Sequence, residues 1–321
     1  MSNYNTSNYR EQGGAIWNIG GQLNILDGGS INIASGGSMV FPNPSGGQDY
    51  FVDGNSGSDT ATGFSWDLSM KTVTVALAAS HANIAASSTG WAARNRIFIK
   101  GDAFTEDLVL LAQKTDIIGV GSYNQWMKAG IVGNHVPISS TGIGVRFFNV
   151  YFRAPAAGGD IFTLNSTQRG IEFHDCTFDA TNTASATGAV IATAVWFLKI
   201  VNCEFVGQYS DAVIKIGAGN AQGLTISNNY IEGANAGVEL NASTTTSPNK
   251  ALIANNIFHT GTECINDAAN VAAIVGNNCV TLQVKGTTGA GAIVGNEYLG
   301  AGNKVAASNL ANADWPALGT L

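Results

Sequence analysis

The sequence predicts an all-β fold, a single-stranded right-handed parallel β-helix, and three observations lead to it: a repeated apolar pattern, sparse charge and abundant glycine. Charged residues make up 12% of the 321 residues, and 40 glycines stand against 6 prolines. So little charge suits the faces and corners of β-sheets, because solvated helices normally carry many lysines and glutamates. We therefore expect a solenoid of short stacked strands over residues 96–299.

The main repeat consists of seven segments that share one apolar pattern around a central polar residue. They cover residues 145–152, 171–178, 198–205, 224–231, 251–258, 273–280 and 292–299. The central residues recur at spacings of 26, 27, 26, 27, 22 and 19, and they are Asn149, Asp175, Asn202, Asn228, Asn255, Asn277 and Asn296. A pattern that returns at this interval is the sequence sign of a solenoid, in which each repeat forms one coil.

Each central residue is expected at a corner between two short strands. Asparagine tolerates the left-handed backbone conformation there, and its amide can hydrogen-bond to the neighbouring coil. Stacked at the strand separation of about 4.8 Å, the seven residues would form an asparagine ladder. Asp175 replaces asparagine once, so its carboxylate would need an extra donor or a raised pKa. Each segment ends on a large apolar residue, and these form an expected internal stack: Phe152, Phe178, Phe205, Ile231, Phe258, Val280 and Leu299.

Two of the four cysteines, Cys176 and Cys203, directly follow the corner residue in adjacent repeats. Asn229, Asn256 and Asn278 continue their column in this alignment. The two thiols should therefore be stacked neighbours. Free thiols are favoured, because a reducing cytoplasm opposes disulfides and the N-terminus shows no apolar signal core. A disulfide between the two stays sterically open as the alternative.

A second, shorter repeat marks residues 1–48. Gly-Gly pairs fall at 13–14, 20–21, 28–29, 36–37 and 46–47, with short alternating strands between them. The apolar residues expected to serve attachment and trimerisation are Ile16, Leu23, Ile25, Ile31, Ile33, Met39 and Phe41. Strands this short cannot bury an apolar face alone, whereas three chains wrapped around one axis can. An intertwined stalk is predicted, and a flexible glycine-rich leader is the alternative.

Residues 49–95 are predicted to form a capping region, and residues 300–321 a loop-like C-terminal tail. A helix is expected over 69–86 with Ser69 as its N-cap, since Val73, Leu77 and Ile84 lie roughly on one helical face. The open end of a solenoid exposes apolar core and unpaired strand edges. The short helix is well placed in the sequence to cover that end.

The opening of the coil region resembles a known family. YFVDGNSGSDT at 50–60, GFSW at 63–66 and KTV at 71–73, followed by an alanine-rich helix, resemble the opening of many pectate-lyase-like β-helix proteins, frequent among phage-encoded ones. The resemblance covers residues 50–299 and is weak for function, because this fold carries lyases, hydrolases, spikes and inert structural pieces alike. The Gly-Gly strands resemble docking or stalk segments of phage virion proteins. Together the two resemblances imply a trimeric surface component of a bacteriophage virion, of the head-decoration or tail-spike type.

Catalytic motifs are hard to find in the sequence. The motifs of polygalacturonases are absent, and the carboxylate-rich calcium site of pectate lyases is not visible. For glycan cleavage the best carboxylate pair is Asp160 and Asp211, expected about two coils apart. Further options are Glu172, Glu204, Glu232 and Glu239.

One loop deserves a metal-site test, because Asp53, Asn55, Gly57 and Asp59 alternate like the ligands of a calcium loop. The glycine and glutamate that an EF-hand requires are missing further along. A turn tied by hydrogen bonds from Asp side chains is therefore the preferred interpretation. No metal site and no cofactor is predicted.

The expected partners are two further copies of the chain and the major capsid or tail protein of the virion. The net charge of −7 and the lack of a basic run argue against nucleic acid, and no apolar stretch is long enough to span a bilayer. We expect a non-enzymatic structural protein on the virion surface, made in the host cytoplasm, with capsid decoration ahead of a tail spike. The alternatives are a spike that depolymerises host polysaccharide and an adhesin that binds host glycan through Tyr151 and Tyr230.

Overall fold

The structure is a computed structural model of the chain, which divides into two compact units, Met1–Met39 and Val40–Leu321. It describes residues 8–10, 17–19, 47–86, 93–101, 104–109, 114–121, 128–133, 135, 143–155, 158–164, 168–181, 186–193, 195–217, 222–240, 251–267, 272–279, 282–285, 293–294 and 297–298.

In the first unit, β1 (Asn8–Arg10) and β2 (Trp17–Ile19) form an antiparallel pair. Strand β2 falls within one of the short strands that the sequence predicts. The residues predicted for attachment and trimerisation lie outside the described residues or have no described side chain: Ile16, Leu23, Ile25, Ile31, Ile33, Met39 and Phe41.

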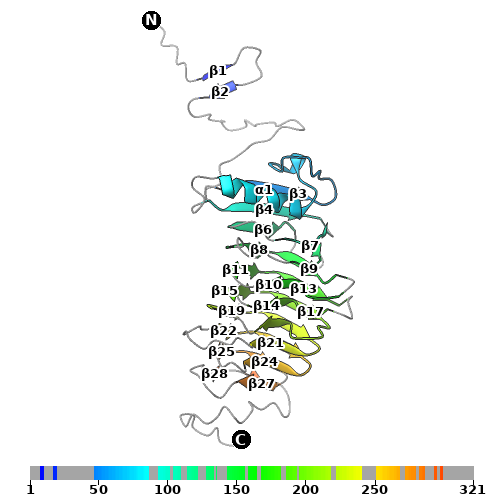
Figure 1. Cartoon of the computed structure of the whole chain (residues 1–321), viewed down its shortest axis with the longest axis vertical. Coiled ribbons are helices and arrows are strands. Elements are labelled where there is room, and N and C mark those ends of the chain that lie inside the picture. The colour runs from blue at the N-terminus through cyan, green and yellow to red at the C-terminus, as the bar shows by residue number, and fades with distance from the viewer. Residues whose placement is uncertain are drawn as a thin grey trace, which may run out of the picture. The chain divides into compact units, whose positions relative to one another are not determined.

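The second unit contains three large parallel sheets (Figure 1). The ten-stranded sheet holds β3 (Asp49–Asp53), β4 (Asn95–Lys100), β6 (Thr115–Gly119), β8 (Arg146–Phe148), β12 (Glu172–His174), β16 (Lys199–Val201), β19 (Thr225–Ser227), β22 (Ala251–Ala254), β25 (Ala272–Val275) and β28 (Ile293–Val294). The nine-stranded sheet holds β5 (Phe104–Thr105), β7 (Ala129–Val132), β9 (Val150–Arg153), β13 (Thr177–Ala180), β17 (Glu204–Gly207), β20 (Tyr230–Gly233), β23 (Ile257–Thr260), β26 (Asn278–Cys279) and β29 (Glu297–Tyr298).

The six-stranded sheet holds β10 (Phe162–Leu164), β14 (Val190–Ala192), β18 (Ile214–Ile216), β21 (Ala236–Leu240), β24 (Glu263–Asp267) and β27 (Leu282–Lys285). A short pair, β11 (Gln168–Arg169) and β15 (Val195–Trp196), completes the parallel strands. From β8 onward the chain visits the ten-, nine- and six-stranded sheets in turn and then returns to the first, one strand further along. We call each such circuit a coil. The prediction of an all-β chain built from parallel strands is confirmed.

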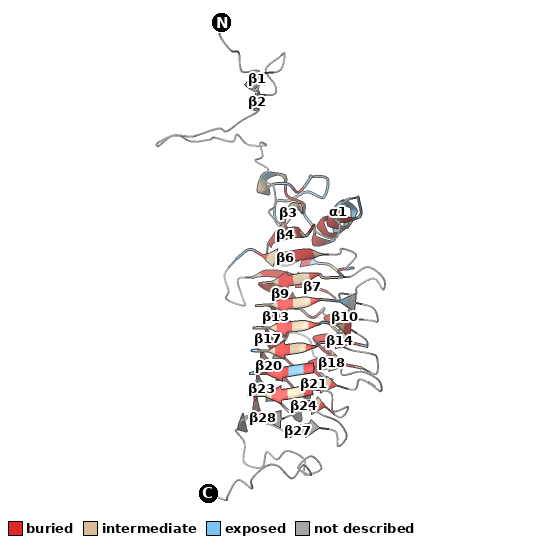
Figure 2. Ribbon diagram, turned by 90° about the vertical axis from the view of Figure 1, so that its left-hand side faces the viewer, coloured by how far each residue is buried: buried red, intermediate tan, exposed pale blue. Residues whose placement is uncertain are grey.

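Side chains alternate between the interior and the surface along each strand, as the two-residue period of a strand requires. In β4 every second residue is buried, and Figure 2 shows the same red and tan alternation in row after row. Register then places each buried residue on its counterpart in the next coil. In the ten-stranded sheet this makes one inward column: Ile97, Ile117, Phe147, Phe173, Ile200, Ile226, Ile253 and Ile274.

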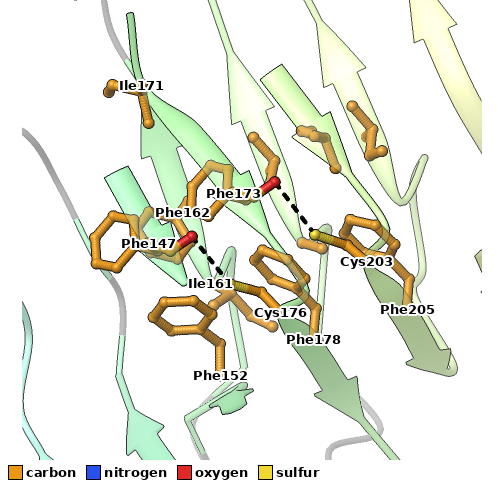
Figure 3. Close-up of a cluster of buried hydrophobic side chains, with 14 of the residues drawn as sticks. Phe147, Phe152, Ile161, Phe162, Ile171, Phe173, Cys176, Phe178, Cys203 and Phe205 are labelled. Atoms are coloured by element: carbon orange, nitrogen blue, oxygen red, sulfur yellow. Dashed lines mark hydrogen bonds between the residues drawn. The ribbon is translucent and has the colours of Figure 1, made fainter. Parts of the chain in front are cut away.

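The nine-stranded sheet contributes a second inward column, which confirms the predicted stack as far as Phe258. Its members are Phe152, Phe178, Phe205, Ile231, Phe258 and Cys279. The rings of Phe178 and Phe205 are parallel with centroids 4.5 Å apart (Figure 3). The sequence alignment had placed Val280 in this column, but register places Cys279 there; Val280 and Leu299 lie outside the described residues.

The helix α1 (Val73–Ala86) follows the 3-10 turn η1 (Trp66–Leu68) and packs against β3 and β4 (Figure 2). Its residues Val73, Ala76 and Leu77 are buried in the same core as the strands. The predicted N-cap was wrong: the helix begins four residues after Ser69, and its first amides are bound by a carboxylate from the next coil. Glu106 accepts hydrogen bonds from the backbone N–H of Val73 at 3.0 Å and of Thr74 at 2.8 Å.

Candidate functional site

The corner between the ten- and nine-stranded sheets has the backbone that the sequence predicted. Five corner residues have a left-handed φ between 54° and 57°, and they are Asn149, Asp175, Asn202, Asn228 and Asn255. Register of the flanking strands places them in one file, so their predicted stacking is confirmed.

The hydrogen-bonded ladder, however, does not run through this column. The side chains of Asn202, Asn228 and Asn255 are exposed, whereas the side chain of Asn149 donates to the Gly119 carbonyl at 3.0 Å. Gly276, with φ 62°, takes the corner position in the coil where Asn277 was predicted. Asn296 lies outside the described residues.

The amide ladder runs one position further along the chain, through Asn229, Asn256 and Asn277, which are 0–2% exposed. The side-chain oxygen Oδ1 of Asn256 accepts two hydrogen bonds from Asn229, one from the backbone N–H at 3.0 Å and one from the side-chain amide at 2.9 Å. The Asn277 oxygen accepts from Asn256 in the same two ways, each at 2.9 Å. Each amide nitrogen also donates to a backbone carbonyl, that of Ile200, Ile226 or Ile253. These buried polar groups therefore satisfy one another across coils.

The same column continues as thiols. Cys203 donates its backbone N–H to the Asn229 side chain at 2.8 Å, and Cys176 lies opposite Cys203 on the neighbouring coil. Both thiols are buried and free, and burial raises the pKa of Cys203. Their sulfur atoms donate to the carbonyls of Phe147 at 3.6 Å and Phe173 at 3.5 Å (Figure 3). Asn277, not Asn278, continues the column, because the register in the penultimate described coil differs by one residue from the sequence alignment.

The outer face of the ten-stranded sheet carries a column of charges that the sequence reading missed. Register stacks residues of alternating sign on six successive strands: Asp49, Arg96, Asp116, Arg146, Glu172 and Lys199. Ion pairs join Arg96 to Asp49 at 2.6 Å, Arg146 to Asp116 at 2.6 Å and Lys199 to Glu172 at 3.0 Å. We call this the charged column.

The charges in this column stabilise one another. Partial burial raises the pKa of Glu172, but hydrogen bonds from His174 and Lys199 outweigh it, and the net effect lowers that pKa. Hydrogen bonding to Asp116 raises the pKa of Arg146 in turn. Both shifts favour the charged forms of Glu172 and Arg146.

An aromatic row lies beside the charged column. Phe51 stacks on Phe98 with centroids 5.4 Å apart, and Phe148 stacks on His174 at 5.0 Å. The guanidinium groups of Arg96 and Arg146 cover Phe98 and Phe148. Neighbouring rings and guanidinium groups therefore lie over faces of these rings, whereas a sugar ring needs an open aromatic face.

The tyrosines proposed for glycan contact are bound within the protein. Tyr151 is 8% exposed and donates its hydroxyl to Asp179, and burial followed by this bond raises its pKa to about 12. Tyr230 donates to Glu232 at 3.4 Å.

Glu204 is one of the further carboxylates considered for glycan cleavage. Burial raises the pKa of Glu204; the positive charge of Lys128 opposes this shift, and the negative charge of Glu232 adds to it.

The carboxylate pair predicted for glycan cleavage lies as expected on equivalent positions two coils apart. Asp160 follows Gly159, which bridges to Ala186, and Asp211 bonds through its backbone N–H to the carbonyl of Thr187. Burial raises the pKa of Asp160, which accepts a hydrogen bond from Thr163 at 3.2 Å. Two strand separations put the pair roughly 10 Å apart, near the upper limit for inverting glycosidases.

Lysine neutralises the second carboxylate of this pair. Lys215 binds Asp211 at 2.8 Å and approaches Glu239 at 3.6 Å. Chemically, the cluster offers one carboxyl group whose pKa is raised by burial and a second carboxyl group that is paired with a lysine. This arrangement can serve an ion-pair network as well as acid–base chemistry.

The loop with calcium-like spacing is held by turn hydrogen bonds. Asp53 accepts from the backbone N–H of Asn55 at 3.0 Å and pairs with Lys100 at 3.0 Å. Asp59 accepts from the backbone N–H of Lys71 at 3.0 Å and of Thr72 at 2.8 Å. Both carboxylates are therefore used by the protein itself, as the turn interpretation required. Within the part of the chain that the structure describes, no three metal-ligating side chains come together.

Comparison of the chain with protein-family models, with curated proteins and with solved structures found no match. None of the helices in the described ranges is long and apolar enough to cross a membrane.

Proposed function

We propose that the protein is a non-enzymatic structural protein of a bacteriophage virion, a homotrimeric surface appendage whose chain coils as a right-handed parallel β-helix. Capsid decoration is the preferred role. The observation that carries the proposal is the interior, where like side chains lie on one another from coil to coil, as Phe147 and Phe173 do at 5.3 Å. Such a column would be stiff along its length, because the strands of each coil are hydrogen-bonded to the strands of both neighbouring coils.

Three sets of contacts support a mechanical role. Aromatic stacking fills the interior of the N-terminal coils, the amide ladder crosses the later coils, and the charged column ties the outer face of the first six strands in the ten-stranded sheet. The charges that the described part of this face presents are largely paired. A surface of this kind is suited to durability.

The two ends of the chain have proposed roles in the same assembly. Helix α1 would cap the interior at the N-terminal end of the column, since it buries Val73, Ala76 and Leu77 against the first strands and its first turn is bound by Glu106. Residues 1–48 would form the stalk that joins three chains and attaches them to the major capsid or tail protein.

The proposal is tested on the full-length chain and on particles. Light scattering in solution should give the mass of three chains, and an antibody label should decorate the heads of phage particles in electron micrographs. A monomeric full-length chain, or particles without the label, would refute the appendage.

A polysaccharide-cleaving tail spike is the second candidate, and the raised pKa of Asp160 two coils from Asp211 is the observation that favours it. Incubation with host capsule or lipopolysaccharide would then release oligosaccharides. Release by the wild type that Asp160→Asn and Asp211→Asn abolish, but that Thr163→Ser leaves intact, would replace the structural role by an enzymatic one.

A further inference from the structure

The outer surface changes character after β16. The charged column ends at Lys199, and the next strands put Thr225, Leu252 and Ala273 in its place. On the other side of the asparagine corner, the outward side chains of the nine-stranded sheet form a column of Tyr230, Ile257 and Asn278.

These positions form a continuous uncharged surface over three coils, which we call the neutral strip. It consists of the outward residues Thr225, Ser227, Asn228, Tyr230, Leu252, Ala254, Asn255, Ile257, Ala273, Val275, Gly276 and Asn278.

Two large apolar side chains are exposed in the middle coil of the neutral strip. Leu252 is 40% exposed and Ile257 is 51% exposed. They stand on either side of the Asn255 corner. Thr225 and Ala273 flank Leu252, Tyr230 and Asn278 flank Ile257, and Glu232 and His259 lie at the edge of the strip. Exposed aliphatic groups on a flat, uncharged surface indicate an area that another surface covers.

Symmetry decides which partner such a surface fits. When identical columns pack side by side in parallel around a rotation axis, residues near the axis meet their own counterparts at the same height. A charged residue there would face its own sign, and this repulsion disfavours the contact. The charged column cannot occupy that position, because Asp116 would meet Asp116 and Arg146 would meet Arg146. The neutral strip meets no such penalty.

We propose that the neutral strip is the surface through which copies of this chain pack against one another, in parallel, near the three-fold axis. The inference rests on the proposed homotrimer and assigns its contact face. The last described coils then hold the columns together, while the charged faces of the earlier coils stay in solvent.

Charge insertion and cross-linking test this assignment on the full-length protein. Leu252→Lys places like charges in the proposed contact, and Val120→Lys makes the same change at a 44% exposed aliphatic residue outside the strip. Ser227→Cys puts an accessible thiol on the strip, and Thr163→Cys puts one on the six-stranded sheet. A short bis-maleimide reports thiols from two chains that lie close together, and the native cysteines are buried.

In the Ser227→Cys background we expect Leu252→Lys to abolish the cross-link with an unchanged circular dichroism spectrum, while the stalk keeps the mass of three chains, and Val120→Lys to leave the cross-link unaltered. Ser227→Cys should give cross-linked chains, and Thr163→Cys should give none. A trimer that shows no cross-link at Ser227→Cys, or whose cross-link survives Leu252→Lys, would overturn the assigned face and leave the homotrimer standing. A monomeric wild type would overturn both. If Leu252→Lys alters the circular dichroism spectrum, the two cysteine variants decide the matter.

Discussion

Acidification should destabilise this protein through one buried histidine. His135 is 0% exposed and lies among phenylalanine rings, with the Phe162 centroid 4.8 Å away. Its Nδ1 accepts the backbone N–H of Leu108 at 3.1 Å, and its Nε2 is buried and has no hydrogen-bond partner among the residues that the structure describes. Burial lowers the pKa of His135 from 6.5 to about 3, although the negative charge of Asp107 opposes the shift.

The sign follows from proton uptake. The unfolded chain binds a proton at this residue below pH 6.5, while the folded chain binds one only near pH 3, so stability is lost as the pH falls between these values. Each pH unit in that window costs about 1.4 kcal/mol. Going from pH 7 to pH 4 should therefore lower the free energy of unfolding by about 3 kcal/mol through His135 alone.

The assay is denaturant unfolding of the wild type and of His135→Asn at pH 7, 5 and 4. Asparagine can keep an acceptor for the Leu108 N–H but does not titrate, so the variant should be less stable at pH 7 and lose less stability on acidification. The difference between the two slopes isolates the histidine from the carboxylates, which titrate in both proteins. Parallel pH profiles for the two proteins would refute the argument.

Three further changes test other parts of the structure. Asn256→Ala should lower the free energy of unfolding by at least about 3 kcal/mol, because it leaves several buried ladder groups unpaired. Asn255→Ala at the exposed corner should lower it by about 1 kcal/mol. Equal losses of the two variants in denaturant unfolding would contradict the placement of the ladder. Glu106→Ala should lower the free energy of unfolding by about 1–2 kcal/mol, because it removes the cap of α1. Amide hydrogen exchange in the first helical turn should then be faster, and an unchanged exchange rate there would contradict the cap. Gly223 and Gly170 share a left-handed backbone, with φ 62° and 65°, but a Cβ on Gly223 would lie 2.6 Å from an aromatic ring of the preceding coil. Gly223→Ala should therefore lower the melting temperature more than Gly170→Ala does, and the reverse order would show that the ring moves freely aside.

The sequence by itself was sufficient for the repeat, the strand corners and most of the inner stack. Asn149, Asn202 and Asn228 could be placed at corners because few residues accept a left-handed backbone, and asparagine is among them. Phe152, Phe178 and Phe205 could be placed inside because large apolar residues recur at the same step of each repeat. These inferences need only local chemistry and a regular period.

Tertiary structure decided which of two consecutive asparagines faces inward. In Asn255–Asn256 either residue could occupy the corner, and a shift of one residue turns every side chain of a strand to the other face. Glycine also accepts a left-handed backbone, so Gly276 serves as the corner in the shorter coil and moves Asn277 into the ladder. The charged column was likewise invisible in the sequence, since partners such as Asp116 and Arg146 are a whole coil apart and become neighbours only when register fixes how the strands pair.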